Sequence, residues 1–197
     1  RIATTMMSQF NKEKAIVFNT VQLYRHDRLA FLKEAHAKAK DGGYLLGVKL
    51  VRGAYMEKER ARAAEMEYAS PIQPNKAASD ADFNQALEYC VANIESIAFC
   101  AGSHNEESNL LLTELLTKAN IDHNHPHVYF AQLFGMSDHI SFNLSADGYN
   151  VAKYVPYGPI AEVIPYLTRR AEENTSVAGQ TSRELKLIQT EMKRRGI

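Results

Sequence analysis

Apolar segments with the length of buried strands alternate with helix-like segments along this 197-residue chain. The apolar segments show no regular alternation of polar and apolar residues, which is typical of parallel strands covered on both faces. The sequence therefore predicts an α/β fold with five βα units. Strands are expected at residues 15–22, 44–52, 97–101, 127–131 and 149–154.

Amphipathic periodicity and end signals mark the helical segments between these strands. Asp41-Gly-Gly43 ends the first helix, and Ser79, with Asp82 three residues later, resembles an N-cap with its capping box. Pro165 is expected to kink the helix that contains it. The expected helices cover residues 26–40, 57–67, 79–93, 106–119, 136–144, 159–174 and 181–195.

The residues that could form a site follow the ends of the expected strands. In a (β/α)8 barrel, this edge of the strands carries the catalytic groups. Five units do not close such a barrel, and an open sheet would need a glycine-rich phosphate loop that this chain lacks. We therefore expect residues 1–197 to be the C-terminal part of a larger barrel, with three strands upstream of Arg1. The strand-end residues are Gln22, 52–55, 103–105, Leu133 and Tyr154.

The charge balance argues against nucleic acid as a partner. Lys+Arg and Asp+Glu both number 23, so the formal net charge is zero, and the chain lacks the basic surplus that neutralises phosphates. No apolar run approaches the roughly 18 residues that span a bilayer. The chain opens on Arg1 and shows no signal peptide, so we interpret it as a trimmed or excised segment.

The cysteines and histidines do not predict a metal site. Cys90 and Cys100 are ten residues apart, outside metal-ligand spacing, and we expect reduced, buried thiols in a reducing compartment. His123, His125 and His127 alternate, which could suggest a metal. They flank Pro126 in a polar segment, so a solvated loop is the favoured interpretation.

Two adjacent arginines point to a small ligand that bears a carboxylate. Arg169 and Arg170 follow the segment Tyr154-Val-Pro-Tyr-Gly-Pro159, and rigid guanidinium forks can hold a carboxylate in one orientation. Glu173 lies four residues after Arg169 and three after Arg170, so it can orient the pair across one helical turn.

Five motifs, in this order and at this spacing, resemble the proline dehydrogenase family from about Asn19 to Ser176. The likeness is to the monofunctional type of mitochondria and some bacteria rather than to the long bifunctional bacterial enzymes. The motifs are Lys49-Leu-Val-Arg-Gly-Ala-Tyr55, Ser103-His-Asn105, Tyr129-Phe-Ala-Gln-Leu-Phe-Gly-Met136, Tyr154-Val-Pro-Tyr-Gly158 and Arg169-Arg-Ala-Glu-Glu-Asn174.

The resemblance implies a distorted (β/α)8 barrel that binds FAD and oxidises L-proline to Δ1-pyrroline-5-carboxylate by hydride transfer to the flavin. Electrons would then pass to a membrane quinone. The implied location is the bacterial cytoplasm, peripheral to the membrane, or the matrix side of the mitochondrial inner membrane. An upstream barrel segment, in the same chain or from a second chain, would complete the barrel.

The resemblance also implies which residues contact the cofactor. Lys49 would lie near the flavin N5, where a cation stabilises the charge of the reduced flavin, and Gln22 would contact the pyrimidine edge. The remaining cofactor residues would line the FAD or hold its ribityl, phosphate or adenine side: Arg52, Gly53, Ala54, Ser103, His104 and Asn105.

The implied substrate residues come from four of these motifs. Tyr55 and Leu133 would wall the proline pocket, and Tyr154 would pack against the proline ring. Arg169 and Arg170 would clamp the carboxylate, with Glu173 holding the pair. The residues implied to act in catalysis are Lys49, Tyr154, Arg169, Arg170 and Glu173.

Two alternatives stay open. The first is 4-hydroxyproline dehydrogenase, whose specific relatives carry a small residue where this chain has the bulky Tyr154. The second is a non-catalytic, incomplete fragment that binds flavin poorly or not at all, because the missing strands supply an active-site lysine and aspartate in the family.

Overall fold

The structure is a computed structural model that describes residues 2–53, 55–176 and 180–196, with the backbone alone at residues 169, 171–176 and 180–184. It consists of two compact units, residues 1–153 and residues 154–197. In chain order, the elements are α1 (Ile2–Phe10), β1 (Asn19–Gln22), α2 (Arg28–Asp41), β2 (Leu46–Val51), α3 (Met56–Glu65), α4 (Lys76–Ala92), β3 (Ile97–Gly102), α5 (Glu106–Lys118), β4 (Val128–Leu133), α6 (Asp138–Ala146), β5 (Val151–Tyr154), α7 (Ile160–Ser176) and α8 (Gln180–Arg195).

The five strands form one parallel sheet in the order β1-β2-β3-β4-β5. Each strand therefore lies beside the strand that follows it along the chain. In the registers of the inner strands, Val48 lies opposite Phe99, and Phe99 lies opposite Val128. The sequence prediction of five parallel strands that alternate with helices is confirmed, and this order is that of consecutive units in a (β/α) barrel.

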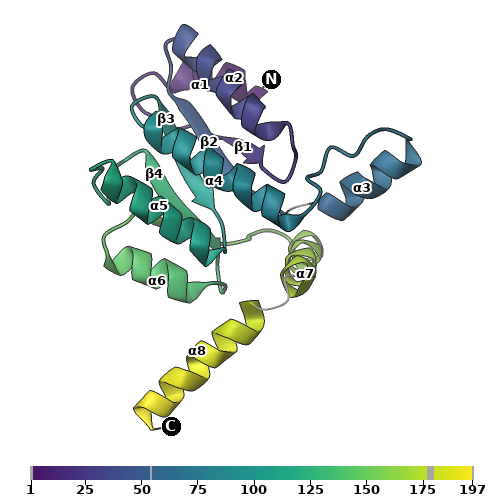
Figure 1. Cartoon of the computed structure of the whole chain (residues 1–197), viewed down its shortest axis with the longest axis vertical. Helices are drawn as coiled ribbons and strands as arrows, with labels where there is room; N and C mark the ends of the chain where they lie inside the picture. The colour runs from purple at the N-terminus through teal and green to yellow at the C-terminus, as the bar shows by residue number, and fades with distance from the viewer. Residues whose placement is uncertain (1, 54, 177–179, 197) are drawn as a thin grey trace. The chain divides into compact units, whose positions relative to one another are not determined.

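Helices cover one face of this sheet (Figure 1). Alternate residues of the strands, including Leu50, Phe99 and Phe130, are buried there with Leu32 of α2 and Phe83 of α4. The residues on the other face are less buried. They follow the register across the sheet as Thr20, Lys49, Cys100 and Tyr129.

The first strand is shorter than the sequence predicts because a side chain binds the backbone that precedes it. The Asn11 carboxamide is buried. Its oxygen accepts hydrogen bonds from the N–H groups of Ile16 and Val17, and its nitrogen donates to the carbonyl of Val17. These backbone groups are bound to Asn11 rather than to a neighbouring strand, so β1 begins only at Asn19.

The fourth helix begins three residues earlier than expected. Its N-cap is Asn75, whose side-chain oxygen accepts a hydrogen bond from the N–H of Ala78 at 2.9 Å. Ser79 is not the cap; it is buried inside the helix. Asp82, the expected partner of Ser79, accepts a hydrogen bond from the Gln73 side chain. Helix α1 was not predicted at all.

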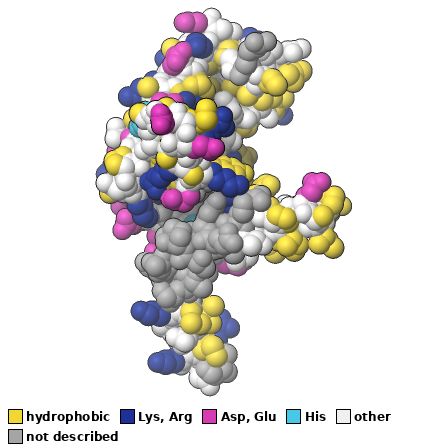
Figure 2. All heavy atoms as spheres, turned by 90° about the vertical axis from the view of Figure 1, so that its right-hand side faces the viewer, with side chains coloured by type: hydrophobic (Ala, Val, Ile, Leu, Met, Phe, Trp, Pro, Cys, Tyr) yellow, Lys and Arg dark blue, Asp and Glu magenta, His cyan; other side chains and the backbone are white. Residues whose placement is uncertain are grey.

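Apolar side chains are exposed on α1 and just before the edge strand β1. Ile2, Met6 and Phe10 are four residues apart on α1, so they lie on one side of that helix, and Ile2 is 83% exposed. Ile16 and Phe18, just before β1, are exposed as well. Figure 2 shows apolar side chains gathered at the upper end of its view, at the level of α1 in Figure 1.

The second unit contains α7 and α8. Pro165 lies inside α7, as the sequence predicts. Among the described residues, no helix has both the length and the apolar character that crossing a membrane requires.

Candidate functional site

The carboxyl edge of the sheet collects most of the predicted site residues of the first unit. Gln22 and Leu133 are the last residues of β1 and β4, and Lys49 lies near the end of β2. Arg52 and Gly53 directly follow β2, and residues 103–105 directly follow β3. Because parallel strands all end at the same edge, one region of this unit receives these side chains.

Lys49 lies on the less buried face of the sheet. Its strand partners in register are Thr20 and Cys100. A Cβ added to Gly102 would come within 3.1 Å of Lys49 Cε and 3.0 Å of Val51 Cγ1. Because Gly102 has no side chain, the side chain of Lys49 has room to lie across β3 at this position.

Arg52 is held in a buried polar network. Its Nη1 lies 2.8 Å from Asp80 Oδ1 of α4, and its Nη2 donates to the hydroxyls of Ser103 at 3.2 Å and Ser108 at 2.8 Å. The guanidinium also stacks on the ring of Phe83. Burial lowers the pKa of Arg52, while Asp80 opposes that shift. The positive charge of Arg52 is thus largely buried, and the carboxylate of Asp80 balances it.

The segment after β2 has an unusual backbone. Gly53 has φ +104°, a conformation that other residues rarely adopt, and a Cβ there would meet nothing within 4 Å. Tyr55 has a left-handed backbone at the start of α3. A hollow of about 460 Å³ opens beside it, and residues of this hollow include Arg25, Tyr55, Lys58, Glu59, Arg62 and Tyr68. Ala54 lies outside the described residues.

The segment after β3 is fixed by hydrogen bonds from both sides. Ser103 Oγ accepts from the N–H of Asn105, and the Asn105 side chain accepts from the N–H of Ser108, which caps α5. His104 Nδ1 lies 2.9 Å from Ser137 Oγ, and its Nε2 accepts a long hydrogen bond of 3.5 Å from the N–H of Leu133. The predicted cofactor residue His104 therefore contacts the predicted substrate residue Leu133.

Gln22 ends β1 with a polar atom that protein contacts leave unsatisfied. Its side-chain oxygen Oε1 is buried and has no hydrogen-bond partner among the described residues. A buried carbonyl oxygen without a donor costs free energy. Gln22 therefore has an acceptor available for a bound group.

Within the second unit, two predicted substrate residues share one aromatic neighbour. The Tyr154 ring packs edge-on against Tyr166, with ring centroids 6.1 Å apart. The Arg170 guanidinium carbon lies 5.4 Å from the centroid of the same Tyr166 ring. The predictions for Arg169 and Glu173 concern side chains outside the described residues.

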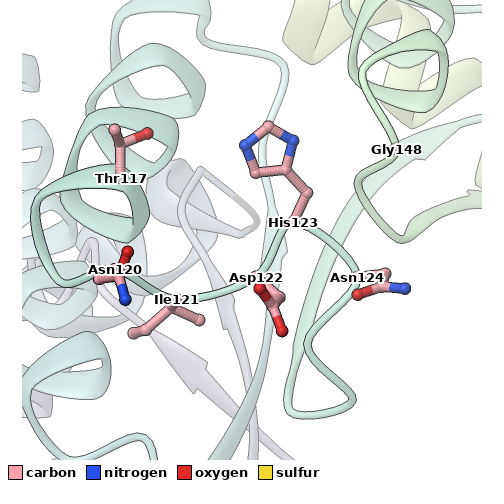
Figure 3. Close-up of a pocket in the computed structure, with 7 residues that line it drawn as sticks. All are labelled: Thr117, Asn120, Ile121, Asp122, His123, Asn124 and Gly148. Atoms are coloured by element: carbon pink, nitrogen blue, oxygen red, sulfur yellow. The ribbon is translucent and has the colours of Figure 1, made fainter.

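The opposite edge of the sheet has a hollow of its own. It has a volume of about 490 Å³ and lies between Thr117, residues 120–124 and Gly148 (Figure 3). These loops precede β4 and β5, so they lie at the amino edge, away from the predicted site. His123 stacks on Tyr149 with centroids 4.1 Å apart, and His127 bonds the carbonyl of Ile94.

The cysteines differ in burial. Cys90 is fully buried, which raises the pKa of its thiol, and Cys100 is only partly covered. Both are free, as expected, but the expectation of a buried thiol is wrong for Cys100. In the part of the chain that the structure describes, no three His, Cys, Asp or Glu side chains cluster in a way that could hold a metal.

Sequence reasoning missed several residues that contact predicted site residues, in the first unit and in the second. Asp80, Ser108 and Ser137 bind predicted site residues through their side chains, and Tyr166 contacts two more. Asp80, Ser108 and Ser137 lie in helices or at a helix start, where polar residues are common, so nothing in their local sequence distinguishes them.

The parallel sheet and its helices form an α/β fold of the partial-barrel class. The candidate site lies at the carboxyl ends of the strands. Residues 1–183 match the family described as Proline dehydrogenase. The chain belongs to the proline dehydrogenase family.

Relatives from animals agree with this assignment. The chain is 41% identical over 198 residues to "Proline dehydrogenase 1, mitochondrial" of Homo sapiens, covering 99% of this chain and 33% of that protein. It is 39% identical over 198 residues to "Hydroxyproline dehydrogenase" of Xenopus laevis, covering 98% of this chain and 42% of that protein. The chain thus spans between a third and a half of the length of these two relatives.

Solved structures agree as well. Proline utilization A from Bdellovibrio bacteriovorus, inactivated by N-propargylglycine, superposes with a TM-score of 0.81 at 29% identity. The match covers 87% of this chain and 18% of the other. Over the matched residues, the chain that carries the candidate site therefore has the same fold as the corresponding part of proline utilization A.

Proposed function

We propose that this chain contributes to an FAD-dependent enzyme that oxidises L-proline to Δ1-pyrroline-5-carboxylate. The observation that carries the proposal is the family match over residues 1–183. It is supported by the polar residues along one edge of a parallel sheet, which is where barrel enzymes carry their chemistry.

The residues of this edge fit a flavin dinucleotide. Gln22 offers a buried acceptor without a protein donor among the described residues, which suits an N–H group of the flavin pyrimidine ring. Lys49 supplies a cation on the less buried face of the sheet, and Gly53 leaves open space where another residue would carry a side chain. Bound FAD would accept the hydride from the carbon next to the proline nitrogen.

The other cofactor residues would hold the rest of the dinucleotide. Arg52 places a charge beside Ser103, and His104 and Asn105 follow directly. We propose that Arg52, with Gly53 and Ala54, lines the FAD, and that residues 103–105 hold its ribityl, phosphate or adenine side. Since Arg52 is also bound to Asp80, its position is set before a ligand arrives.

The substrate residues would orient the proline ring and exclude water. We propose that Tyr55 and Leu133 wall the pocket and that Tyr154 packs on the ring. Arg169 and Arg170 would bind the carboxylate, with Glu173 orienting them. Orientation of this kind is the main contribution that a protein makes when a cofactor carries the chemistry.

We propose that residues 1–197 form the C-terminal part of the barrel and include the helices at about residues 159–195. The exposed apolar side chains of α1, and those of residues 16 and 18 just before the edge strand β1, support this proposal. Uncovered apolar surface beside an open strand edge favours further strands. These would come from the same polypeptide or from a second chain.

We extend the same proposal to the electron acceptor and to the location of the protein in the cell. A membrane quinone would reoxidise the flavin, at the bacterial membrane or at the matrix side of the mitochondrial inner membrane. An enzyme for 4-hydroxyproline is the second candidate, because the hydroxyproline relative is nearly as similar as the proline one. The bulk of Tyr154 favours proline, since a ring hydroxyl needs additional space.

The test of the cofactor proposal is the flavin content of the purified holoenzyme. We expect a yellow protein with the flavin absorption bands, and we expect Gln22→Leu to lower the affinity for FAD. Asn124→Leu, at the opposite edge of the sheet, is the control and should leave that affinity unchanged. A colourless protein that does not bind added FAD would contradict the proposal and favour a non-catalytic fragment.

A further inference from the structure

The loop between β4 and α6 is tied at both of its ends. Together with the last residue of β4 it covers residues 133–137, and it begins with that residue, Leu133, which the proposed function assigns to the wall of the proline pocket. At the far end, Ser137 is 1% exposed and has a left-handed backbone with φ 51°. A residue without a glycine's freedom holds this conformation only where its surroundings enforce it.

His104 holds this loop from the side of β3. Its Nδ1 lies 2.9 Å from the hydroxyl of Ser137, while its Nε2 accepts the N–H of Leu133. One imidazole ring thus contacts the first and the last residue of the loop. The Ser137 carbonyl is bound in turn by the N–H groups of Ile140 and Ser141 at the start of α6.

Lys153 of β5 holds the same loop through its carbonyl groups. Its Nζ donates to the carbonyl of Met136 at 2.7 Å and to the carbonyl of Leu133 at 3.4 Å. The carboxylate of Asp138 lies 2.7 Å from the same ammonium and fixes it in place. The Lys153 side chain is 21% exposed, so water competes only weakly for these bonds.

We propose that Lys153 is a positioning residue that fixes the loop of residues 133–137 and, through it, the Leu133 wall of the substrate pocket. This inference rests on the proposed function for the role of Leu133. Lys153 itself does not touch the substrate in this account; it acts through the two carbonyl groups. A single charged group that binds both ends of a tight turn restricts the turn far more than one neutral bond does.

Lys153→Met tests the proposal in the holoenzyme, because methionine keeps most of the side chain's volume and removes its donor. The KM for L-proline should rise about tenfold, as expected when a pocket wall loses its position, while kcat stays within about twofold. Amide hydrogen exchange of residues 133–137 should become faster. Lys12→Met is the matched control, because Lys12 also donates to two carbonyls, those of Gly42 and Gly43, away from the site.

The outcomes separate the inference from the proposed function. Unchanged exchange in residues 133–137 overturns the inference, and so does faster exchange with an unchanged KM. Failure of the wild-type holoenzyme to oxidise proline counts against the proposed function instead, and hydrogen exchange then still decides whether Lys153 fixes the loop. If Lys153→Met does not fold, Asp138→Asn removes only the ion pair and should give the same changes with smaller amplitude.

Discussion

Removing the charge of Asp80 should destabilise the first unit much more than removing the charge of Lys76, one of its two ion-pair partners. Asp80 pairs with both Arg52 and Lys76. The Arg52 side chain is 11% exposed, whereas that of Lys76 is 64% exposed. A guanidinium stays protonated in proteins, so Asp80→Asn leaves a buried charge without its counter-ion, whereas Lys76→Met removes a partner that water already solvates.

The size of the effect follows from the contacts that remain. Removing one partner of a buried ion pair costs about 3–5 kcal/mol. Asp80 is 24% exposed, and the hydroxyls of Ser103 and Ser108 still accept bonds from Arg52. We therefore expect Asp80→Asn to lower the free energy of unfolding by about 2–3 kcal/mol. For Lys76→Met we expect about 0.5 kcal/mol or less.

Urea denaturation followed by circular dichroism measures both free energies of unfolding, and thermal denaturation should show Tm lowered by about 4–10 °C for Asp80→Asn. The double variant Arg52→Met with Asp80→Leu is the control, because it removes both charges and should recover much of the loss. Equal costs for Asp80→Asn and Lys76→Met would show that Arg52 does not depend on its buried partner.

Three further predictions concern the substrate residues and the core. Arg170→Met should raise the KM for proline by roughly 30- to 1000-fold, the equivalent of about 2–4 kcal/mol for a lost charge-assisted contact; steady-state kinetics with unchanged FAD content would show it, and an unchanged KM would remove Arg170 from the site. Tyr154→Ser should shift the ratio of kcat/KM values toward trans-4-hydroxyproline, because it removes ring packing of about 1–3 kcal/mol and opens space for a hydroxyl. A ratio that stays constant would exclude Tyr154 as the selector. His36 is buried between Tyr89 and Ser96, and burial, with a smaller effect of Lys40, lowers its pKa. The folded state therefore binds fewer protons than the unfolded state, so the free energy of unfolding should fall as pH drops from about 7 to about 5. Urea midpoints for His36→Gln should fall less steeply over that range, and equal slopes would exclude His36.

The sequence predicted the sheet well because long apolar segments report burial directly. Among the described residues, helices cover one face of β2, β3 and β4 while the other face is less buried, so the expected cover on both faces is not found in this part of the fold. The apolar residues of the covered face have no other stable environment in water. β1 was predicted four residues too long, because a run of apolar residues does not reveal that Asn11 binds the backbone of residues 16 and 17. Such a contact between a side chain and a backbone five or six residues further along leaves no periodic signal.

The sequence predicted individual residues of the candidate site, but it did not predict the hydrogen bonds and ion pairs that these residues make. Motifs identified Arg52, Ser103 and His104, since each follows a strand. Their partners Asp80 and Ser137 come from a helix and from a loop far along the chain. Only the packing of α4 and of the segment before α6 against the sheet brings these partners into contact, and a single sequence carries no record of that packing.

We propose that this chain forms part of a flavoenzyme that takes electrons from proline. Anaerobic titration of the purified holoenzyme with L-proline, followed by the flavin absorption bands, is the decisive experiment. We predict bleaching of those bands that saturates with proline concentration and is weaker with trans-4-hydroxyproline. A flavin spectrum that does not change on addition of either compound would contradict the account.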